Sequence, residues 1–497
     1  MEKDKIYQDC IKILEIERSK SIDLYKYKSI ELWPWIRRCL LDAYLKKIRG
    51  EKIKQLNKNN LLNLKLLLTH SLIYIKSKKK FKNYLKNLSI EKTDVLIVDQ
   101  ENDYLDKINY LAYNRYSDPF YELLKSKKKV NKITTSNQRN SLNALYPSLL
   151  INCEELLLYY FSKHYLLSFI PKKSLQKVFE KLISELDLKI DLDFCVNNFV
   201  KILSFEKLFI SVLSSSKPKI IFCKMFYSVE NMGLNLAAKK LGIKVIDIQH
   251  GKNGKYNHMM SCWSRFPKNG YKLLPDFFWT WGDYFSTNIN THFPKNLSKH
   301  HTISGGNLWL SKCIHQNPFE LTENESVFLE KIKSKNCILF ALQPIDKENT
   351  IPEWVINAII ETPEYFWLIR RHPRQSTSDV NYKNTNELEN VDTEFASTIP
   401  LSVLLNNCIY NITLWSSVCI DALEFNVKSA IIHQEGFKIY EKEIGDGVFD
   451  YCTNEHELKL VLKKTKKTHL NQKKMISDPE IIKNNLLKFV ESFFTTT

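Results

Sequence analysis

One five-residue segment gathers side chains that bind phosphate. The run Arg370-Arg371-His372-Pro373-Arg374 directly follows an apolar stretch of strand length. Arginine offers paired N–H donors that match phosphate oxygens, and histidine can donate a hydrogen bond or a proton to a departing phosphate. Pro373 fixes a turn that presents His372. We interpret the segment as a phosphate site, with a solvated basic surface as the alternative.

A second anion-binding pattern follows about one strand and one helix later. Ser416 and Ser417 stand before a predicted helix that runs from Val418 to Phe425. Either hydroxyl suits the N-cap, and the free N–H groups of a helix start attract anions. A plain cap would explain the serines alone. Their place beside the Arg/His segment in the same predicted sheet favours a shared site.

A third polar group ends another predicted strand. The sequence Asp247-Ile248-Gln249-His250-Gly251 turns at a glycine, which allows a backbone or a ligand to approach closely. We expect Gln249, His250 and Gly251 to contact substrate. For His250, a purely structural hydrogen bond explains the sequence equally well.

The elements that position these residues alternate between strand and helix, which predicts parallel sheets. We expect an α/β protein with two facing, doubly wound Rossmann-like domains, and ligands beyond the carboxyl ends of the strands. The domain at 91–306 carries a helical insertion at about 140–217. The other segments are a basic helical N-terminal segment at 1–90, a linker at 307–335, a second Rossmann-like domain at 336–475 and a C-terminal helix at 476–497.

The charge is concentrated at the start of the chain. The formal net charge is +18, and residues 1–90 hold 22 Lys and Arg against 9 Asp and Glu. A one-sided basic segment indicates nucleic acid or an anionic membrane surface, or else a solvated lysine-rich face. Within it, Trp33-Pro34-Trp35 interrupts the helical pattern. These tryptophans either lie at lipid headgroups or pack against the domain.

Composition excludes several classes of protein. With 44% hydrophobic residues and only 12 glycines, the chain is neither disordered nor fibrous. Its 11 cysteines show no C-x-x-C pair and no zinc-type spacing, which predicts a reduced, intracellular protein without a metal site. The start has no signal peptide, and the most apolar stretches are too short and too charged to span a membrane.

Taken together, these motifs resemble GT-B-type bacterial glycosyltransferases of capsule and lipopolysaccharide synthesis, which carry a His-Pro motif and a Ser pair. That group includes sialyl-, polysialyl- and Kdo-transferases with CMP-activated sugars. The resemblance covers roughly residues 94–460. It rests on Asp247-Ile248-Gln249-His250-Gly251, Leu274-Pro275-Asp276, Trp281-Gly282, Gly305-Gly306-Asn307, Arg371-His372-Pro373, and Ser416-Ser417 with Asp421-Ala422-Leu423.

The resemblance implies transfer of a sugar from a CMP-activated donor, such as Kdo or a sialic acid, to a glycan or lipid-linked acceptor. His372 and Ser416/Ser417 would hold the donor phosphate, and the loop that starts at Gln343 would contact the nucleoside or sugar. No cofactor and no metal are expected. With the basic N-terminus, the resemblance predicts a cytoplasmic enzyme on the inner face of the membrane, with no nucleic acid as partner.

Inverting transfer also needs a general base on the acceptor side. The acidic motif typical of the family is not cleanly present. The candidates are Asp99, Glu101 and Asp103 after the first strand, which we favour slightly, and Glu230 at a helix start. Alternative functions are a polyol-phosphate transferase of the CDP-glycerol or CDP-ribitol type on the same scaffold, a sugar-nucleotide epimerase and, more distantly, a nucleic-acid-binding protein.

Overall fold

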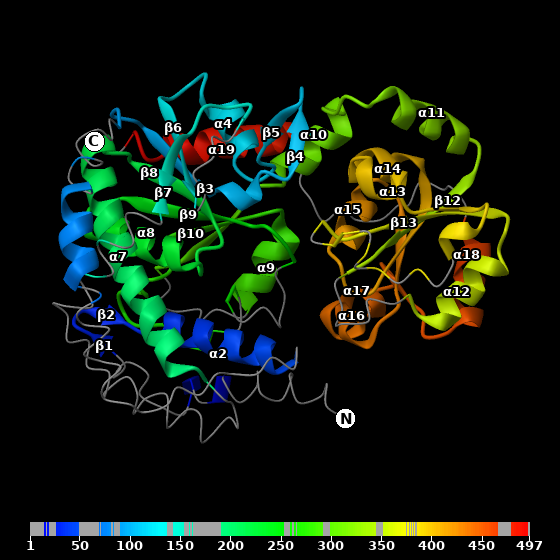
Figure 1. Ribbon diagram of the computed structural model, residues 1–497, viewed down its shortest axis with the longest axis horizontal. Coiled ribbons are helices and arrows are strands. Elements are labelled where there is room, and N and C mark those ends of the chain that lie inside the picture. Colours follow the sequence, from blue (N-terminus) through cyan, green and yellow to red (C-terminus); the bar gives the residue numbers. More distant parts are fainter. Residues whose placement is uncertain are drawn as a thin grey trace. The chain divides into compact units, whose positions relative to one another are not determined.

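The chain forms two compact units, Met1–Leu308 with Glu480–Thr497 and Trp309–Pro479. Each contains its own parallel β-sheet with helices packed on it (Figure 1). The computed structural model describes residues 26–48, 71–80, 90–136, 143–153, 190–252, 266–291, 299–343, 351–373, 385–465 and 479–495, with a few single positions between these ranges.

The sheet of the first unit has seven parallel strands in the order β11-β10-β9-β8-β3-β6-β7. The first of them along the chain, β3, lies between β6 and β8, so the sheet extends to both sides of it. The strands are β3 (Val95–Gln100), β6 (Val130–Ser136), β7 (Leu149–Asn152), β8 (Ile220–Lys224), β9 (Lys244–Ile248), β10 (Phe277–Thr280) and β11 (His301–Ser304).

Side chains of β3 alternate between two hydrophobic clusters, as the two-residue period of a strand requires. Leu96 and Val98 join a cluster with α7 and α8, whereas Val95 and Ile97 join one with α4 and α19. The sheet is therefore covered on both faces. The helices of this unit include α4 (Asp118–Leu124), α7 (Leu192–Ser216), α8 (Val229–Lys240), α9 (Asp283–Thr291) and α19 (Pro479–Glu491).

Two of the few glycines have identifiable structural roles. Gly242 has a φ of +71° just after α8, where the left-handed conformation ends the helix. Gly306 has a φ of +99°, and a Cβ atom there would lie 2.1 Å from Ile482 of α19. Its carbonyl accepts a 2.9 Å hydrogen bond from Trp279 Nε1. The Gly-Gly pair thus lets the C-terminal helix pack closely against the sheet.

The N-terminal tryptophans are part of the core. Helix α2 (Trp33–Ile48) begins at Trp33 with Pro34 in its first turn, so the predicted interruption of the helical pattern is wrong: proline is well tolerated at a helix start. Trp33 and Trp35 are 0% and 1% exposed, and they join a cluster with α7. Of the two predicted alternatives, the structure shows packing against the domain, preceded by the short hairpin β1 (Lys26–Tyr27) and β2 (Ile30–Glu31).

The second unit has a six-stranded parallel sheet in the order β14-β13-β12-β15-β16-β17. Hydrophobic clusters again lie on both faces. The strands are β12 (Asn336–Ala341), β13 (Tyr365–Arg370), β14 (Val391–Asp392), β15 (Cys408–Thr413), β16 (Lys428–Ile431) and β17 (Asp450–Tyr451). The helices include α10 (Leu308–Gln316), α11 (Glu323–Ile332), α12 (Glu353–Ile360), α13 (Phe395–Thr398), α14 (Leu401–Asn407), α15 (Val418–Glu424), α16 (Gln434–Ile439), α17 (Glu441–Gly445) and α18 (Glu455–Lys464).

The predicted fold class is confirmed, since both sheets are parallel and Rossmann-like. The segment interpreted as a helical insertion contains α7, but its residues Leu149–Asn152 form strand β7, which pairs with β6. The segment interpreted as a linker contains both α10 and α11. Among the described residues, no helix has the length and apolar character that a membrane span requires.

Candidate functional site

The predicted phosphate-binding residues come together at one edge of the second sheet. Ala341, the last residue of β12, pairs with Arg370 at the end of β13 on one side and with Thr413 at the end of β15 on the other. The loops that carry Gln343, Arg371 to Pro373, and Ser416 with Ser417 therefore leave three adjacent strands at the same edge. The register places them where ligands bind in doubly wound sheets. Arg374 lies outside the described residues.

The two described arginines of this segment differ in their contacts. Arg370 donates from one terminal nitrogen to the carbonyl oxygens of Ala396 and Ile399, at 2.7 and 2.6 Å. These bonds hold helix α13 to the sheet and give Arg370 a structural role, while the phosphate-binding role predicted for it stays a prediction. Arg371 is half-buried, and its guanidinium lies 3.3 Å from the hydroxyl of Tyr382.

His372 lies in a turn that the chain itself stabilises. Its backbone N–H donates to Oε1 of Gln375 at 2.9 Å, its side chain is half-buried, and Pro373 is exposed. At the adjacent loop, Ser416 Oγ accepts a 3.3 Å bond from the N–H of Val418, whereas the side chain of Ser417, at the N-cap position, caps no helix N–H. Ser416 thus acts as the cap, and the Ser417 hydroxyl is left for other partners.

Gln343 follows β12 in the middle of this edge. Its side-chain oxygen is buried and accepts no hydrogen bond within the described structure. A buried amide oxygen without a partner is unfavourable by about 1 to 3 kcal/mol, and a ligand that donates to it would remove that penalty. The residues that follow it, 344–350, lie outside the described ranges.

One residue at this edge was missed by the sequence prediction. His433 comes two residues after the end of β16, the strand that pairs with β15, and its ring lies 4.7 Å from that of Trp415 in the serine loop. Nδ1 of His433 accepts a 3.1 Å bond from the N–H of Glu435, which places the proton of the neutral ring on Nε2. Its position right after a predicted strand was the available signal.

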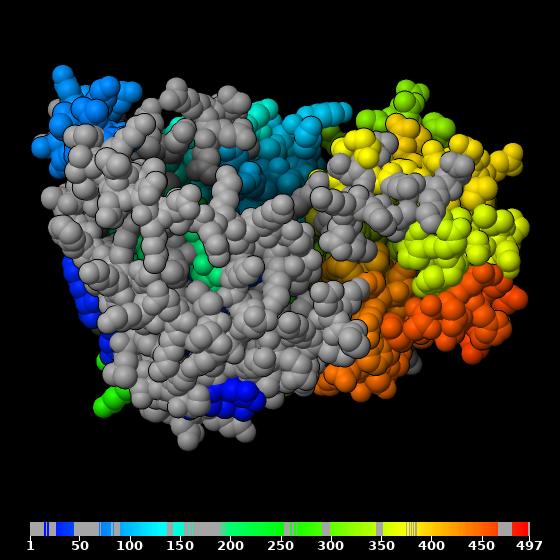
Figure 2. Space-filling model, turned by 60° about the horizontal axis from the view of Figure 1, so that its bottom comes forward, coloured from blue at the N-terminus to red at the C-terminus, as the bar shows by residue number. Residues whose placement is uncertain are grey.

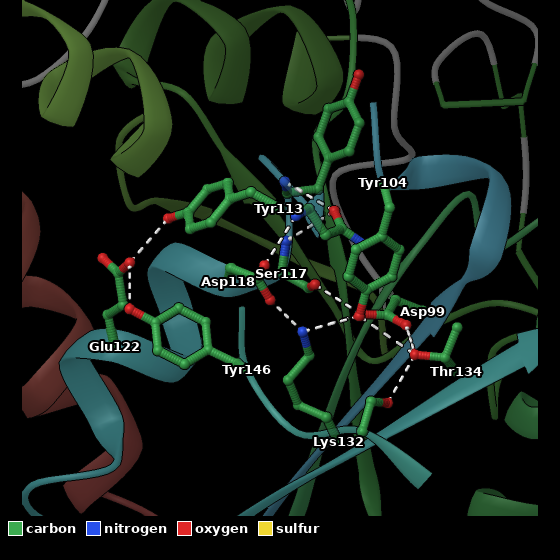
Figure 3. Close-up of polar contacts among 12 residues, drawn as sticks. Asp99, Tyr104, Tyr113, Ser117, Asp118, Glu122, Lys132, Thr134 and Tyr146 are labelled. Carbon is green, nitrogen blue, oxygen red and sulfur yellow. Dashed lines mark hydrogen bonds and ion pairs between the residues drawn. The ribbon is translucent and has the colours of Figure 1, made fainter. Parts of the chain in front are cut away.

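The corresponding edge of the first sheet contains a buried ionic network (Figure 3). The Lys132 ammonium, from β6, contacts Asp118, lies 3.4 Å from Asp99 Oδ2 and donates to the hydroxyl of Tyr104 at 3.0 Å. Burial alone would lower the pKa of Lys132, but the two carboxylates raise it above its usual value. Burial also raises the pKa of Asp118 to about 6, against the opposing charge of Lys132. Both carboxylates are therefore held by the protein itself.

The four predicted base candidates differ in how accessible they are: two are buried and two are partly accessible. Asp99 is 4% exposed and accepts hydrogen bonds from the side chains of Tyr104, Ser117 and Thr134. Asp103 is 6% exposed and paired with Lys224; burial raises its pKa. Neither is open to an acceptor.

Glu101 and Glu230 remain accessible in part. Glu101 accepts a hydrogen bond from the hydroxyl of Ser136, at the end of β6. Glu230, in the first turn of α8, lies 3.4 Å from the amide nitrogen of Gln100 at the end of β3. Both side chains are half-buried, so their carboxylates lie at the carboxyl edge of the sheet within reach of a ligand.

The third predicted group, which follows β9, forms hydrogen bonds within the first unit. Gln249 is 1% exposed; its amide donates to the carbonyl of Gly251 at 2.8 Å and accepts from the N–H of Trp281 at 2.9 Å. It joins two loops, and its predicted contact with substrate stays a prediction. His250 is half-buried, and its Nε2 lies 3.1 Å from the hydroxyl of Tyr227. Burial, with Lys224 nearby, lowers the pKa of His250 to about 3.

In the described part of the chain, no group of three or more His, Cys, Asp or Glu side chains is placed to bind a metal ion. No protein-family model matches the chain, and no curated protein matches it. Among solved structures, the UDP-GlcNAc 2-epimerase from Methanocaldococcus jannaschii is similar over 80% of this chain and 99% of its own, with 13% identity and a TM-score of 0.50.

The fold is of the GT-B type. At this level of identity the likeness concerns the fold alone. Two further structures match with lower TM-scores. UDP-GlcNAc 2-epimerase from Neisseria meningitidis has 12% identity, coverage of 81% and 100% of the two chains and a TM-score of 0.48. The wall teichoic acid polymerase TagF has 12% identity, coverage of 88% and 93% and a TM-score of 0.44.

Proposed function

We propose that this GT-B-type protein is a glycosyltransferase that uses a CMP-activated donor, such as Kdo or a sialic acid, without a metal ion. The acceptor is a glycan of the capsule or lipopolysaccharide kind. The observation that supports this is the edge of the second sheet, where adjacent strands bring together Gln343, His372 and the Ser416/Ser417 pair. Those residue types suit a nucleotide and its phosphate.

The proposed chemistry follows from where charge develops. As the bond from sugar to phosphate breaks, negative charge grows on the departing phosphate, and hydrogen-bond donors placed there lower the barrier. His372 would donate to that phosphate, with Arg371 beside it and the hydroxyl of Ser417 as a second donor. Gln343 Oε1 would accept from a donor group of the nucleoside and so acquire the partner it lacks among the described residues.

The general base then comes from the first unit. We propose Glu101 or Glu230, because a base must reach the proton it removes and Asp99 and Asp103 are paired inside the protein. The acceptor hydroxyl would lose its proton to this carboxylate as it attacks the sugar carbon. An inverted configuration at that carbon is the expected stereochemical result.

A panel of activated donors tests the proposal. The purified chain is incubated with CMP-Kdo, CMP-sialic acid, CDP-glycerol, CDP-ribitol and UDP-GlcNAc, each with glycan acceptors, and released nucleotide and transferred sugar are measured by mass spectrometry. We expect transfer from a CMP-sugar. His372→Ala should lower kcat by about a hundredfold or more, as loss of a charge-stabilising donor does.

The matched control is His456→Ala, an exposed histidine of α18 in the same unit, which should retain full activity. Glu101→Gln and Glu230→Gln, assayed in the same way, identify the base. Release of CMP from CDP-polyols alone would replace the proposal with polyol-phosphate transfer, and epimerisation of UDP-GlcNAc without transfer would replace it with an epimerase. A folded His372→Ala variant with full activity would refute the role of His372.

A further inference from the structure

The helical residues 71–80 of the first unit have one face packed on the protein. Tyr74 stacks on Tyr159, with ring centroids 5.4 Å apart, and packs against the cluster that α7 forms with the sheet. Ile73 and Ser77 are half-buried on the same side. At about 100° per residue, these three side chains occupy one arc of the helix. These contacts therefore define the face of the helix that packs on the protein.

The opposite face is apolar and basic at once. Leu72 and Ile75 are 60% and 68% exposed, and Lys76 and Lys79 lie on the same side of the helix because residues three and four apart share a face. We call Leu72, Ile75, Lys76, Lys79 and the adjoining exposed Lys80 the lysine face. In Figure 2 this helix lies at the upper left margin of the molecule, in bright blue.

The sequence around this helix carries a single sign of charge. Residues 52–90 contain ten lysines and no Asp, Glu or Arg. No side chain of this stretch of the sequence therefore offers a carboxylate to the lysine face. An occupant of this surface has to be negatively charged and has to accept two exposed aliphatic side chains.

We propose that the lysine face docks on an anionic membrane surface. There, Leu72 and Ile75 enter the boundary between headgroups and acyl chains, while the lysine ammonium groups remain with the lipid phosphates. An apolar centre flanked by lysines is the arrangement expected of a helix that lies in the membrane interface. The buried Trp33 and Trp35 take no part in it, and the docking is independent of the reaction proposed above.

A nucleic acid fits this surface less well. Protein contacts to nucleic acids use arginine for paired hydrogen bonds and aromatic rings for stacking on bases. The segment has no arginine, and within the described helix at 71–80 the exposed apolar side chains are the aliphatic Leu72 and Ile75. Binding to a phosphate backbone would leave Leu72 and Ile75 in water, whereas a membrane removes both from it.

Vesicle sedimentation of the full chain tests the proposal. We expect binding to vesicles that contain phosphatidylglycerol and phosphatidylcholine, weakening as sodium chloride rises, and little binding to phosphatidylcholine alone. Lys76→Gln with Lys79→Gln should weaken binding by about thirtyfold, at about fivefold per lysine near an anionic surface. Leu72→Ser with Ile75→Ser should weaken it at every salt concentration, because the apolar contribution is not screened.

Two matched control pairs lie on exposed surfaces of the second unit. Lys463→Gln with Lys464→Gln changes the charge equally, and Val327→Ser with Ile360→Ser removes equally exposed aliphatic side chains. Both should bind vesicles as the unchanged chain does. The proposal would be overturned if the chain bound neutral and anionic vesicles equally well, or if the control pairs weakened binding as much as the lysine-face pairs do. Displacement of the protein from vesicles by duplex DNA would also overturn it. Circular dichroism of each variant shows that it is folded.

Discussion

The carboxyl edges of the two sheets have the same topology but opposite chemistry. In the first unit, the ionisable groups are buried and paired: Lys132 lies among carboxylates, and Lys224 contacts Asp103. In the second unit, the polar groups are partly exposed and are held mainly through backbone contacts, as at His372 and Ser416. The first edge is organised around its own internal charges, whereas the second leaves side-chain groups for a ligand.

This difference between the two edges shows that an acidic cluster after a strand is not by itself a catalytic site. Asp99 and Asp103 have the residue type and the position of a general base, yet each is held by partners within the protein. A buried ion pair contributes little net stability when both partners are present, but removal of one leaves an uncompensated buried charge. Substitutions in the buried network of the first edge should therefore affect folding, whereas substitutions at the second edge should affect ligand chemistry.

The largest effect is expected from Lys132→Met. The methionine fills a similar volume but leaves Asp99 and Asp118 buried without their cation, which should destabilise the first unit by about 3 to 5 kcal/mol. Hydrogen exchange of the β3 and β6 amides measures it, with the β12 and β13 amides as an internal reference that should not change.

Lys107→Met, at an exposed lysine of the same unit, is the matched control and should leave exchange unchanged. Adding Asp118→Asn to Lys132→Met removes one of the two unpaired charges and should restore part of the protection. Unchanged exchange in the single variant would show that the network does not hold this edge together, and the contrast between the two edges would fail.

A pH-dependent effect is expected from Asp247→Asn in β9. Burial raises the pKa of Asp247 to about 8, while its Oδ1 accepts a 2.8 Å bond from the N–H of Phe226. Because the folded-state pKa lies above the unfolded value of about 3.9, this carboxyl stabilises the fold most at low pH and loses that contribution as pH rises toward 8. Asparagine keeps the acceptor and carries no charge.

The variant should therefore be more stable than the parent chain at pH 8, and the gap should close as pH falls toward 4, by about 1.4 kcal/mol for each pH unit at most. Urea unfolding followed across this range, together with hydrogen exchange of β9, provides the measurement. Asp446→Asn, in the second unit, serves as the control. A gap that widens as pH falls would contradict the assignment of a neutral, structural carboxyl to this edge.

Much of the fold could be predicted from the sequence because its strands are apolar, short and bounded by polar residues. The predicted alternation of strands and helices, with parallel pairing in two sheets, is confirmed. The strand Leu149–Asn152 was missed because three apolar residues beside a helical pattern carry no distinguishing period. Trp33-Pro34-Trp35 was taken as a break because proline stops helices inside them but begins them equally well.

For the candidate site, the sequence was enough to predict which residue types gather and at which edge of the sheet they lie. The register of β12 with β13 and β15 brings the predicted His372 and Ser416 loops to one edge, as the alternating pattern indicated. Which side chains are already used inside the protein could not be predicted, since Arg370 binds carbonyls of residues 26 and 29 positions later. Such long-range partners leave no local signal in a sequence.

The smallest effect on stability, and the sharpest test of the second edge, is expected at Ser417. Its hydroxyl caps no helix N–H, so Ser417→Ala should change the free energy of unfolding by no more than about 0.5 kcal/mol. Loss of a hydrogen bond to a charged phosphate should lower kcat/KM for the donor by about tenfold to a hundredfold. Ser416→Ala is the matched comparison: it removes the cap of Val418 and should reduce stability by about 0.5 to 2 kcal/mol. If Ser417→Ala instead unfolds more easily and keeps full turnover, the second edge is structural like the first, and the contrast between the two sheets disappears.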